Sequence, residues 1–519
     1  MKKILLSMAA ALTMASTVQA GGYVTNTNHN AAFLRNPAQE AKIDINALYP
    51  NPAGIGFLDK GWHLSFNIQS AFQHRDVTSN FGQQPGYFTL GTVNSQRNAT
   101  GEKEFRGRAK APVIPALDVA YVHDRWSAMF HFALGGGGGK CDFEDGLGSF
   151  ESIGAMLPVA LNGIAQSMSN GQLGTAANPI VDGYSLNSWM KGRQYYYGFQ
   201  LQGGYKVLDN LNVSAGLRGV YATCFYEGYM GDLAVHTTQA AAALGLPAGQ
   251  NVPAQDLVQK LLLTDATAAA SATAATAAAA SALVQNRSLE VDQSGFGLTP
   301  VLGVDWRIND QWNVAAKYEF KTRLRLKNDT HVNTTGLPAY DDGVKQAADI
   351  PALLTLGAQY NPLRNLHLNV GAHIYFDKQA SQYDASTGQN TKQEKLNGQT
   401  WEILAGVEWD IEDWVTVSAG WQTTNYGLGD NSQYISDMSF VTNSNSIGLG
   451  ARFNISKVVA IDVAYFKTLY KHYRVDYEDY NGLGARLGQA LGNPDLKIPG
   501  YNDFYRTNDV FGVGVNVKF

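Results

Sequence analysis

After its first twenty residues, the sequence has no apolar run long enough for a membrane-spanning helix. Such a helix needs about 20 consecutive apolar residues. Charged residues are also scarce, at 16% of the chain, whereas soluble domains carry roughly 25%. These two shortages exclude a helical membrane protein and disfavour an ordinary soluble domain.

Cysteine and basic charge are sparse as well. The only cysteines, Cys141 and Cys224, fall on predicted strands that are not neighbours. We therefore expect two free thiols, with a disulfide as the alternative. The formal net charge of −5 and the pI of about 6.1 argue against a nucleic-acid partner.

The N-terminus has the pattern of an export signal. Lys2 and Lys3 precede an apolar stretch, Ile4 to Ala15, and the small-residue pattern Val18-Gln19-Ala20 follows. This arrangement predicts a secretory signal peptide over residues 1–20, so the mature chain begins at Gly21. The residue directly after the predicted cleavage site is Gly21 and not a cysteine, which disfavours the lipoprotein route.

Period-two alternation dominates the rest of the chain. In the last strand every second residue from Phe511 to Phe519 is apolar, and the residues between are Gly, Asn or Lys. Side chains alternate across a strand, so one face is wholly apolar. Comparable runs predict fourteen strands, near residues 62–77, 113–123, 126–142, 194–207, 212–229, 292–307, 311–327, 350–361, 366–377, 400–410, 414–426, 443–454, 458–474 and 508–519.

The connections between these runs alternate between short and long. Six are tight turns, most of them rich in Asp and Asn, and Trp126, Trp312 and Trp414 stand just after three of them. Short turns on one side and long loops on the other are typical of outer-membrane barrels, with aromatic residues at the interfaces. The long loops are expected near residues 78–112, 143–193, 230–291 and 328–349.

These patterns predict an all-β fold: a 14-stranded antiparallel transmembrane β-barrel over residues 61–519, in the outer membrane of a Gram-negative bacterium. The aromatic C-terminal strand is typical of substrates of the barrel-assembly machinery, and the outer face contacts outer-membrane lipid. A barrel of this width needs water or a plug inside. Residues 21–60 show no alternation and are the candidate plug.

The end of that segment carries a specific motif. Asn51, Pro52 and Ala53 are followed by Gly54-Ile55-Gly56-Phe57-Leu58 and then by the first strand. This stretch resembles the hatch of the FadL/TodX family, outer-membrane transporters of long-chain fatty acids and other hydrophobic compounds. Further landmarks resemble the family in order along the chain: Ala111-Pro112, Met230-Gly231-Asp232-Leu233, Gln293 to Gly297, and Ile350-Pro351. Taken alone, Asn-Pro-Ala is ordinary turn chemistry.

The resemblance implies a function. It implies uptake of a hydrophobic small molecule by loop capture, lumen binding, hatch rearrangement and lateral exit through a kink in the third strand. Glycines weaken or bulge a strand, and a run of five lies where that kink is expected: Gly135, Gly136, Gly137, Gly138 and Gly139. The simpler alternative is a flexible strand end.

Candidate ligand contacts lie on two strands. On the seventh, alternation places Lys317, Glu319, Lys321, Arg323, Arg325 and Lys327 in the lumen, where Lys321, Arg323 and Arg325 could bind a carboxylate. Pairing with hatch acids such as Glu40, Asp44 or Asp59 is the structural alternative. On the fifth, Tyr226 and Tyr229 are candidates. Fatty-acid transporters of the family have an Arg here that corresponds to Gly228, so this pocket is expected to be more aromatic and less basic.

The long loops offer a surface for first contact. A helix-like apolar stretch covers residues 153–161, and Ala-rich sequence with apolar residues at 258–263 lies within 232–284. Ala favours helix. The resemblance implies that such loop helices form a capture groove with Gly336-Leu337-Pro338 as a second wall, while the run from Ala268 to Ala282 is better explained as low-complexity filler.

No motif indicates an enzyme, a cofactor or a metal site, because zinc spacings, phosphate-binding loops and nucleophile elbows are absent from the sequence. Two other functions remain open. One is a surface receptor or binding protein, for haem for example, with His131, His367 or His373 as ligands. The other is a diffusion porin, which has an open lumen.

Overall fold

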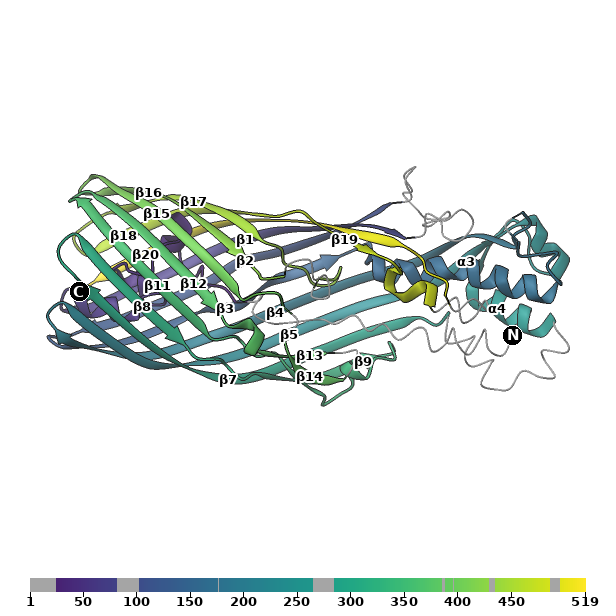
Figure 1. The fold of residues 1–519 in the computed structure, drawn as a ribbon, viewed down its shortest axis with the longest axis horizontal. Coiled ribbons are helices and arrows are strands. Elements are labelled where there is room, and N and C mark those ends of the chain that lie inside the picture. Colours follow the sequence, from purple (N-terminus) through teal and green to yellow (C-terminus); the bar gives the residue numbers. More distant parts are fainter. Residues whose placement is uncertain are drawn as a thin grey trace.

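The computed structural model of the chain describes residues 25–81, 102–175, 177–264, 284–384, 388–394, 396–428, 435–485 and 495–519. The predicted signal peptide and the Ala-rich run 268–282 lie outside these residues. The described chain forms a long barrel with the C-terminus at one end and helices α3 and α4 at the other (Figure 1). None of its helices is both long and apolar enough to cross a membrane.

Fourteen antiparallel strands form the closed barrel wall within the described residues, as predicted. β20 pairs with both β18 and β1, and places Phe66 opposite Val515, so the last strand closes the barrel against the first. The wall strands in order are β1 (Gly61–Phe81), β2 (Lys103–Val122), β3 (Trp126–Phe143), β4 (Val181–Leu208), β5 (Leu211–Thr237), β7 (Arg287–Arg307), β8 (Trp312–Glu319) continued by β9 (Arg325–Asn333), β11 (Leu353–Leu363), β12 (Leu366–Tyr375), β15 (Thr400–Glu412), β16 (Val415–Asn425), β17 (Ser444–Asn454), β18 (Val459–Tyr470) continued by β19 (Tyr473–Tyr477), and β20 (Gly500–Lys518).

The outer wall is apolar, as the alternation predicted. On β20, the outward residues Phe511 and Val513 are 52% and 49% exposed, whereas Asn516, further along the same strand, is 7% exposed. Leu201 on β4 and Val370 on β12 are among the outward side chains of the other strands. Such a band faces lipid in outer-membrane barrels, so the fold is of the transmembrane type.

The short turns lie at the end of the barrel that holds the C-terminus (Figure 1). Trp126, Trp312 and Trp414 are exposed beside these turns, where indole rings suit a membrane–water interface. Both cysteines are free: Cys141 is half-buried on β3, and Cys224 is buried on β5.

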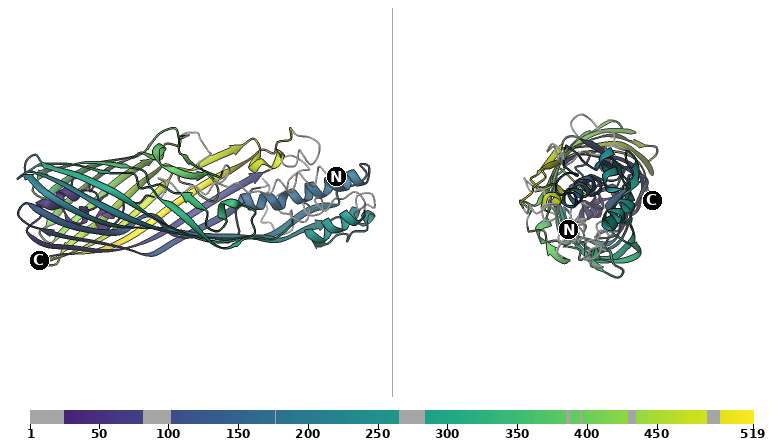
Figure 2. Two further views of the ribbon diagram at one scale, coloured as in Figure 1. Left: turned by 90° about the horizontal axis from the view of Figure 1, so that it is seen from below. Right: turned by 90° about the vertical axis from the view of Figure 1, so that its right-hand side faces the viewer.

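The strands run further than the alternation indicated, and parts of the predicted loops are wrong for that reason. β4 begins at Val181 and β5 ends at Thr237, so these two strands carry the helices α3 (Gly148–Met168) and α4 (Ala254–Thr264) beyond the rest of the wall (Figure 2). Here the strands pack on helices and loops instead of lipid. Without a lipid face, the period-two signal fades. Smaller elements of this end are η4 (Gln239–Leu244), β6 (Asn251–Pro253), η5 (Pro338–Tyr340), β10 (Lys345–Ala347), η6 (Asp377–Gln379), β13 (Ser381–Asp384), β14 (Gln389–Lys392) and η8 (Tyr480–Gly482).

The seventh strand changes phase part-way, which overturns half of its predicted lumen face. Lys317 and Glu319 on β8 are buried in the lumen as expected. The chain then leaves the ladder between Glu319 and Arg325, and the buried residues become Leu324, just before β9, and Leu326 and Asn328 on β9. Lys327 and the arginines at 323 and 325 are therefore exposed and do not face the lumen. One irregular stretch shifts every later side chain to the other face.

Candidate functional site

The N-terminal stretch of residues 25–58, here called the lumen segment, lies inside the barrel. It contains the short helices α2 (Ala31–Arg35), η2 (Ile45–Ala47) and η3 (Pro52–Phe57). α2 contacts β1, β16, β17, β18 and β20, whereas η3 contacts β2, β3, β4, β5, β7 and β8. Nearly all residues from 29 to 56 are buried. The segment therefore fills the cross-section of the barrel at this level.

Asn51 holds the end of the lumen segment. Its side-chain oxygen accepts a hydrogen bond from the Gly54 backbone and caps η3, with Pro52 at the first helical position. Its amide nitrogen donates to the Lys42 carbonyl at 3.1 Å and to Asp305 of β7 at 2.5 Å. Asn212 of β5 donates to the Ala53 carbonyl at 2.5 Å. All three residues of the predicted motif are buried between strands, which explains their small or polar character.

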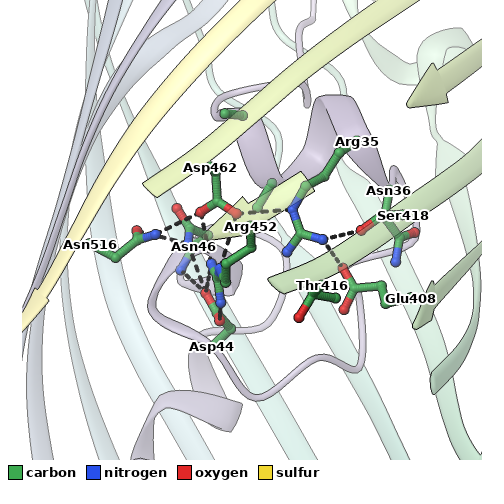
Figure 3. A network of polar contacts seen from close by, with 12 residues as sticks. Arg35, Asn36, Asp44, Asn46, Glu408, Thr416, Ser418, Arg452, Asp462 and Asn516 are labelled. Carbon is green, nitrogen blue, oxygen red and sulfur yellow. Dashed lines mark hydrogen bonds and ion pairs between the residues drawn. The ribbon is translucent and has the colours of Figure 1, made fainter. Parts of the chain in front are cut away.

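A buried ion-pair network joins α2 and the following turn to the wall (Figure 3). Arg35 lies between Glu408 of β15 at 2.8 Å and Asp462 of β18 at 3.0 Å. Arg452 of β17 bridges Asp462 at 2.8 Å and Asp44 of the lumen segment at 2.5 Å. Removing one member leaves an uncompensated buried charge, at a cost of several kcal/mol, about 3–5. This side of the lumen segment is therefore firmly anchored.

The wall is interrupted between β2 and β3. Register partners run from Gly107↔Phe143 to Lys110↔Lys140 and resume only at Leu117↔Phe132. Residues 111–116 of β2 contain two prolines, which have no N–H to donate. The facing stretch of β3 contains the glycine run, and Gly137 has a φ of +83° that side chains rarely adopt. Both strands therefore lack what a continuous ladder needs.

The start of the lumen segment occupies the free edge of β3 at this break. Thr25 forms an isolated bridge with Gly136. Asn26 donates from its backbone to Gly135 at 3.1 Å and from its side chain to the Gly137 carbonyl at 2.8 Å. These are neutral hydrogen bonds between one short stretch of chain and one strand edge. Breaking this contact costs less than breaking the buried ion pairs with β15, β17 and β18.

A buried histidine chain continues from the same stretch. His29 contacts the Asn26 carbonyl through Nε2 at 2.8 Å and His131 of β3 through Nδ1 at 3.0 Å. His131 in turn contacts Asp118 of β2 at 2.6 Å. The chain crosses between β2 and β3 beside the break, where the two strands pair again. It links the position of the lumen segment to the edges of the break.

Two adjoining cavities lie on the loop side of the lumen segment. The inner one has a volume of about 230 Å³ and is lined by Asn26, by Gly137 of the break and by polar wall residues. The outer one, of about 70 Å³, is almost wholly apolar. Met190, Tyr226 and Met438 line both cavities. The two cavities therefore adjoin at these three side chains, between the loops and the break in the wall.

The predicted ligand residues separate into two groups. Tyr226 and Tyr229 line the outer cavity together with Gly228. The charged residues Glu227 and Arg287 line it too, so the cavity is aromatic but not free of basic side chains. Lys321 and Arg325 instead lie 3.6 and 2.5 Å from the buried Asp349, and Arg323 is exposed. Two residues of the basic row thus pair with Asp349 and not with the acids of the lumen segment.

The outer cavity also contains residues of three long loops, of which only Leu337 was expected from the sequence. Phe150 comes from α3, Leu337 from the loop before η5, and Met438 from the loop between β16 and β17. Tyr340 of η5 completes the apolar wall, and burial raises the pKa of its phenol, which keeps it neutral. Only the long loops bring these residues together. Leu337 does belong to the expected second wall.

The histidines considered as haem ligands are engaged elsewhere. His367 contacts Asp410 at 3.0 Å, and His373 lies between Glu40 at 3.0 Å and Glu402 at 2.7 Å. His131 belongs to the chain described above. Among the described residues there is no group of three or more His, Cys, Asp or Glu that could hold a metal ion.

Models of known protein families and curated proteins give no match to the sequence, but solved structures match the fold. A Pseudomonas aeruginosa FadL homologue has a TM-score of 0.57 at 15% identity, over 96% of this chain and 100% of that one. A mutant of the TodX monoaromatic hydrocarbon channel has a TM-score of 0.51 at 13% identity, over 95% and 98%. This chain has the FadL/TodX fold.

The P. putida toluene transporter TodX has a TM-score of 0.49 at 12% identity, over 92% of this chain and 94% of that one. The match to the FadL homologue covers nearly the whole of both chains. In this chain the FadL/TodX fold combines a filled lumen, an interrupted wall and a cavity between them.

Proposed function

We propose that this protein takes up hydrophobic small molecules, such as long-chain fatty acids, across the outer membrane of a Gram-negative bacterium. The observation that carries the proposal is the pair of adjoining cavities that lie between the loops and the break between β2 and β3. Two proteins with this fold are described as a FadL homologue and as a monoaromatic hydrocarbon channel. Both descriptions support a hydrophobic cargo for this chain.

Capture begins at the loop end. α3 and α4 pack with the tips of β4 and β5 into an apolar cluster, and Phe150 of α3 reaches the outer cavity. A hydrophobic molecule that leaves water for this cavity gains about 25 cal/mol for each Å² of apolar surface buried. The aromatic lining then favours an apolar cargo over a hydrated solute.

The hatch comprises residues 21–60 and includes the lumen segment. Its ion-paired side on β15, β17 and β18 stays in place, because breaking buried ion pairs is costly. Its first residues hold the β3 edge through a few neutral hydrogen bonds. A rearrangement limited to residues 25–28 therefore uncovers the break and leaves Asn30, which caps α2 and donates to the Asn46 carbonyl, in place.

Lateral exit suits such a cargo. A molecule released through the wall passes directly into lipid, whereas release into the periplasm exposes it to water at roughly 0.8 kcal/mol for each CH₂ group. The glycine run and the two facing prolines leave the wall unpaired at the level of the inner cavity. The wall opening is therefore the exit for the cargo.

The C-terminal strand has a separate role. The barrel-assembly machinery recognises this strand when it inserts the chain into the outer membrane.

Blocking the outer cavity tests the proposal. Gly228 lines this cavity and has room for a side chain, so Gly228→Trp fills it. Cells producing the variant should take up the neutral hydrophobic fluorophore N-phenylnaphthylamine no faster than cells without the protein.

The matched control is Gly203→Trp, which adds the same side chain at a strand glycine on the exposed face of β4. This control should transport like the unmodified protein, and both variants should show the heat-dependent gel shift of a folded barrel. Normal uptake by a folded Gly228→Trp barrel contradicts the proposed route.

A further inference from the structure

Two arginines face each other inside the barrel above the lumen segment. Arg75 of β1 and Arg506 of β20 are register partners on neighbouring strands. Both side chains point inward and line the inner cavity. Like charges directly opposite each other on a sheet are destabilising. An arrangement of this kind calls for a compensating negative charge.

No carboxylate supplies that charge in the described part of the chain. Neither arginine lies within 4.0 Å of an acidic side chain among the described residues, and the Nε atoms of both are buried without an acceptor. Arg506 donates to neutral groups, the Phe440 carbonyl at 3.1 Å and Gln73 at 3.2 Å. Arg75 lies 5.6 Å from the Phe440 ring and beside the Cys141 thiol.

Other arginines in the lumen do have carboxylate partners. Arg218 pairs with Glu319, and Arg452 pairs with both Asp44 and Asp462. The barrel thus supplies carboxylates to the arginines that hold its structure together. Among the described residues, the three arginines that line the inner cavity have no such partner: Arg75, Arg506 and Arg193, which lies over the Tyr195 and Phe225 rings and is not a register partner of the other two.

We propose that Arg75 and Arg506 form a subsite for the carboxylate of an amphiphilic cargo. Guanidinium groups bind carboxylates through paired N–H donors, which suits two adjacent arginines. The apolar part of the cargo extends toward Met190, Tyr226 and Met438, which connect the inner cavity to the apolar outer one. The inference rests on the proposed function, since the cargo reaches the subsite through the same two cavities.

Binding of two ligands with the same tail tests the subsite. The purified full-length protein is titrated with octanoate and with 1-octanol, which lacks the charge. The double variant Arg75→Gln/Arg506→Gln should bind octanoate more weakly by at least about tenfold, because a hydrogen bond to a charged group contributes roughly 1.5–3 kcal/mol. Its affinity for 1-octanol should not change.

Arg106→Gln is the control, because Arg106 is exposed and pairs with Glu104 outside the cavity. It should leave both affinities unchanged. Acetate, titrated in parallel, should bind far more weakly than octanoate. Acetate binding as tight as that of octanoate shows a site for any small carboxylate and overturns the assignment to cargo.

The outcomes separate the two proposals. If the unmodified protein binds neither octanoate nor 1-octanol, the proposed function fails. If it binds both and the double variant keeps its octanoate affinity, the proposed function stands and the arginine subsite is wrong. The heat-dependent gel shift shows in each case that the barrel is folded.

Discussion

Asn51 shows how one residue joins the lumen segment to the wall. Its side chain caps η3 and also reaches Asp305, which lies on a strand far away in sequence. The turn chemistry of Asn-Pro is visible in the sequence, but the partner on β7 is not. Both contacts are buried, so the residue type matters at both ends.

Substitution of Asn51 should loosen the lumen segment locally. Asn51→Ala removes the cap and leaves Asp305 with fewer donors, so we expect the free energy of local opening of residues 52–58 to fall by about 1–3 kcal/mol. Hydrogen exchange of the backbone amides in this stretch measures the change.

Asn51→Ser separates the two contributions. Serine also caps helices, but its side chain is too short to keep the contact with Asp305. Its effect on exchange should therefore be smaller than that of Asn51→Ala. Equal protection of residues 52–58 in all three proteins contradicts the anchoring role.

Single residues of the site were predictable only where a local pattern or the family resemblance indicates them. Tyr226 and Tyr229 were proposed because they flank the position that corresponds to the family's Arg, and both line the outer cavity. Arg323 and Arg325 were assigned to the wrong face, because the irregular stretch after Glu319 leaves no mark in the alternation. Arg75 and Arg506 meet only through the pairing of the first and last strands, which no local pattern reveals.

At the scale of elements, α2 depends on one charged side chain. Arg35 is 1% exposed and contacts acidic residues of two different strands. The helix has only five residues, too short to be stable alone. Its position therefore depends on the ion pairs and on the wall glycines that make room for it.

Removing the Arg35 charge should undock α2. Arg35→Gln leaves Glu408 and Asp462 with less positive charge, so docking of the lumen segment should weaken by roughly 3–5 kcal/mol. Protease accessibility and hydrogen exchange of residues 31–47 measure the effect. Lys497→Gln removes an exposed ion pair with Glu478, and it should change neither quantity. Equal protection of the segment in Arg35→Gln shows that the network is dispensable.

The elements themselves were largely predictable. All fourteen wall strands follow from alternation, because lipid outside and polar groups inside impose period two on each. The strand extensions at the loop end were missed where that contrast disappears. The glycine run marked the break on β3, but the two prolines on β2 acquire meaning only from the register that sets them opposite it.

At the scale of the molecule, the lumen segment is held unevenly. Buried ion pairs fix it to β15, β17 and β18, while hydrogen bonds between neutral groups hold its start at the break. Its path across the lumen could not be predicted, since its contacts join residues hundreds of positions apart. That unevenness gives the barrel a preferred place to open.

Restoring the wall between β2 and β3 tests this account most directly. The variant Pro112→Thr/Pro115→Val/Gly135→Val returns N–H donors to β2 and a side chain to β3, with Gly137 kept because of its positive φ. The control is Pro300→Val/Gly203→Val, the same kinds of change on exposed wall positions away from the break.

The quantity measured is the rate at which N-phenylnaphthylamine enters cells that produce each folded variant. The account predicts that the restored wall lowers the rate to that of cells without the protein, while 1-octanol still binds and the control variant transports normally. Uptake at the unmodified rate through a barrel with a restored wall would contradict lateral exit.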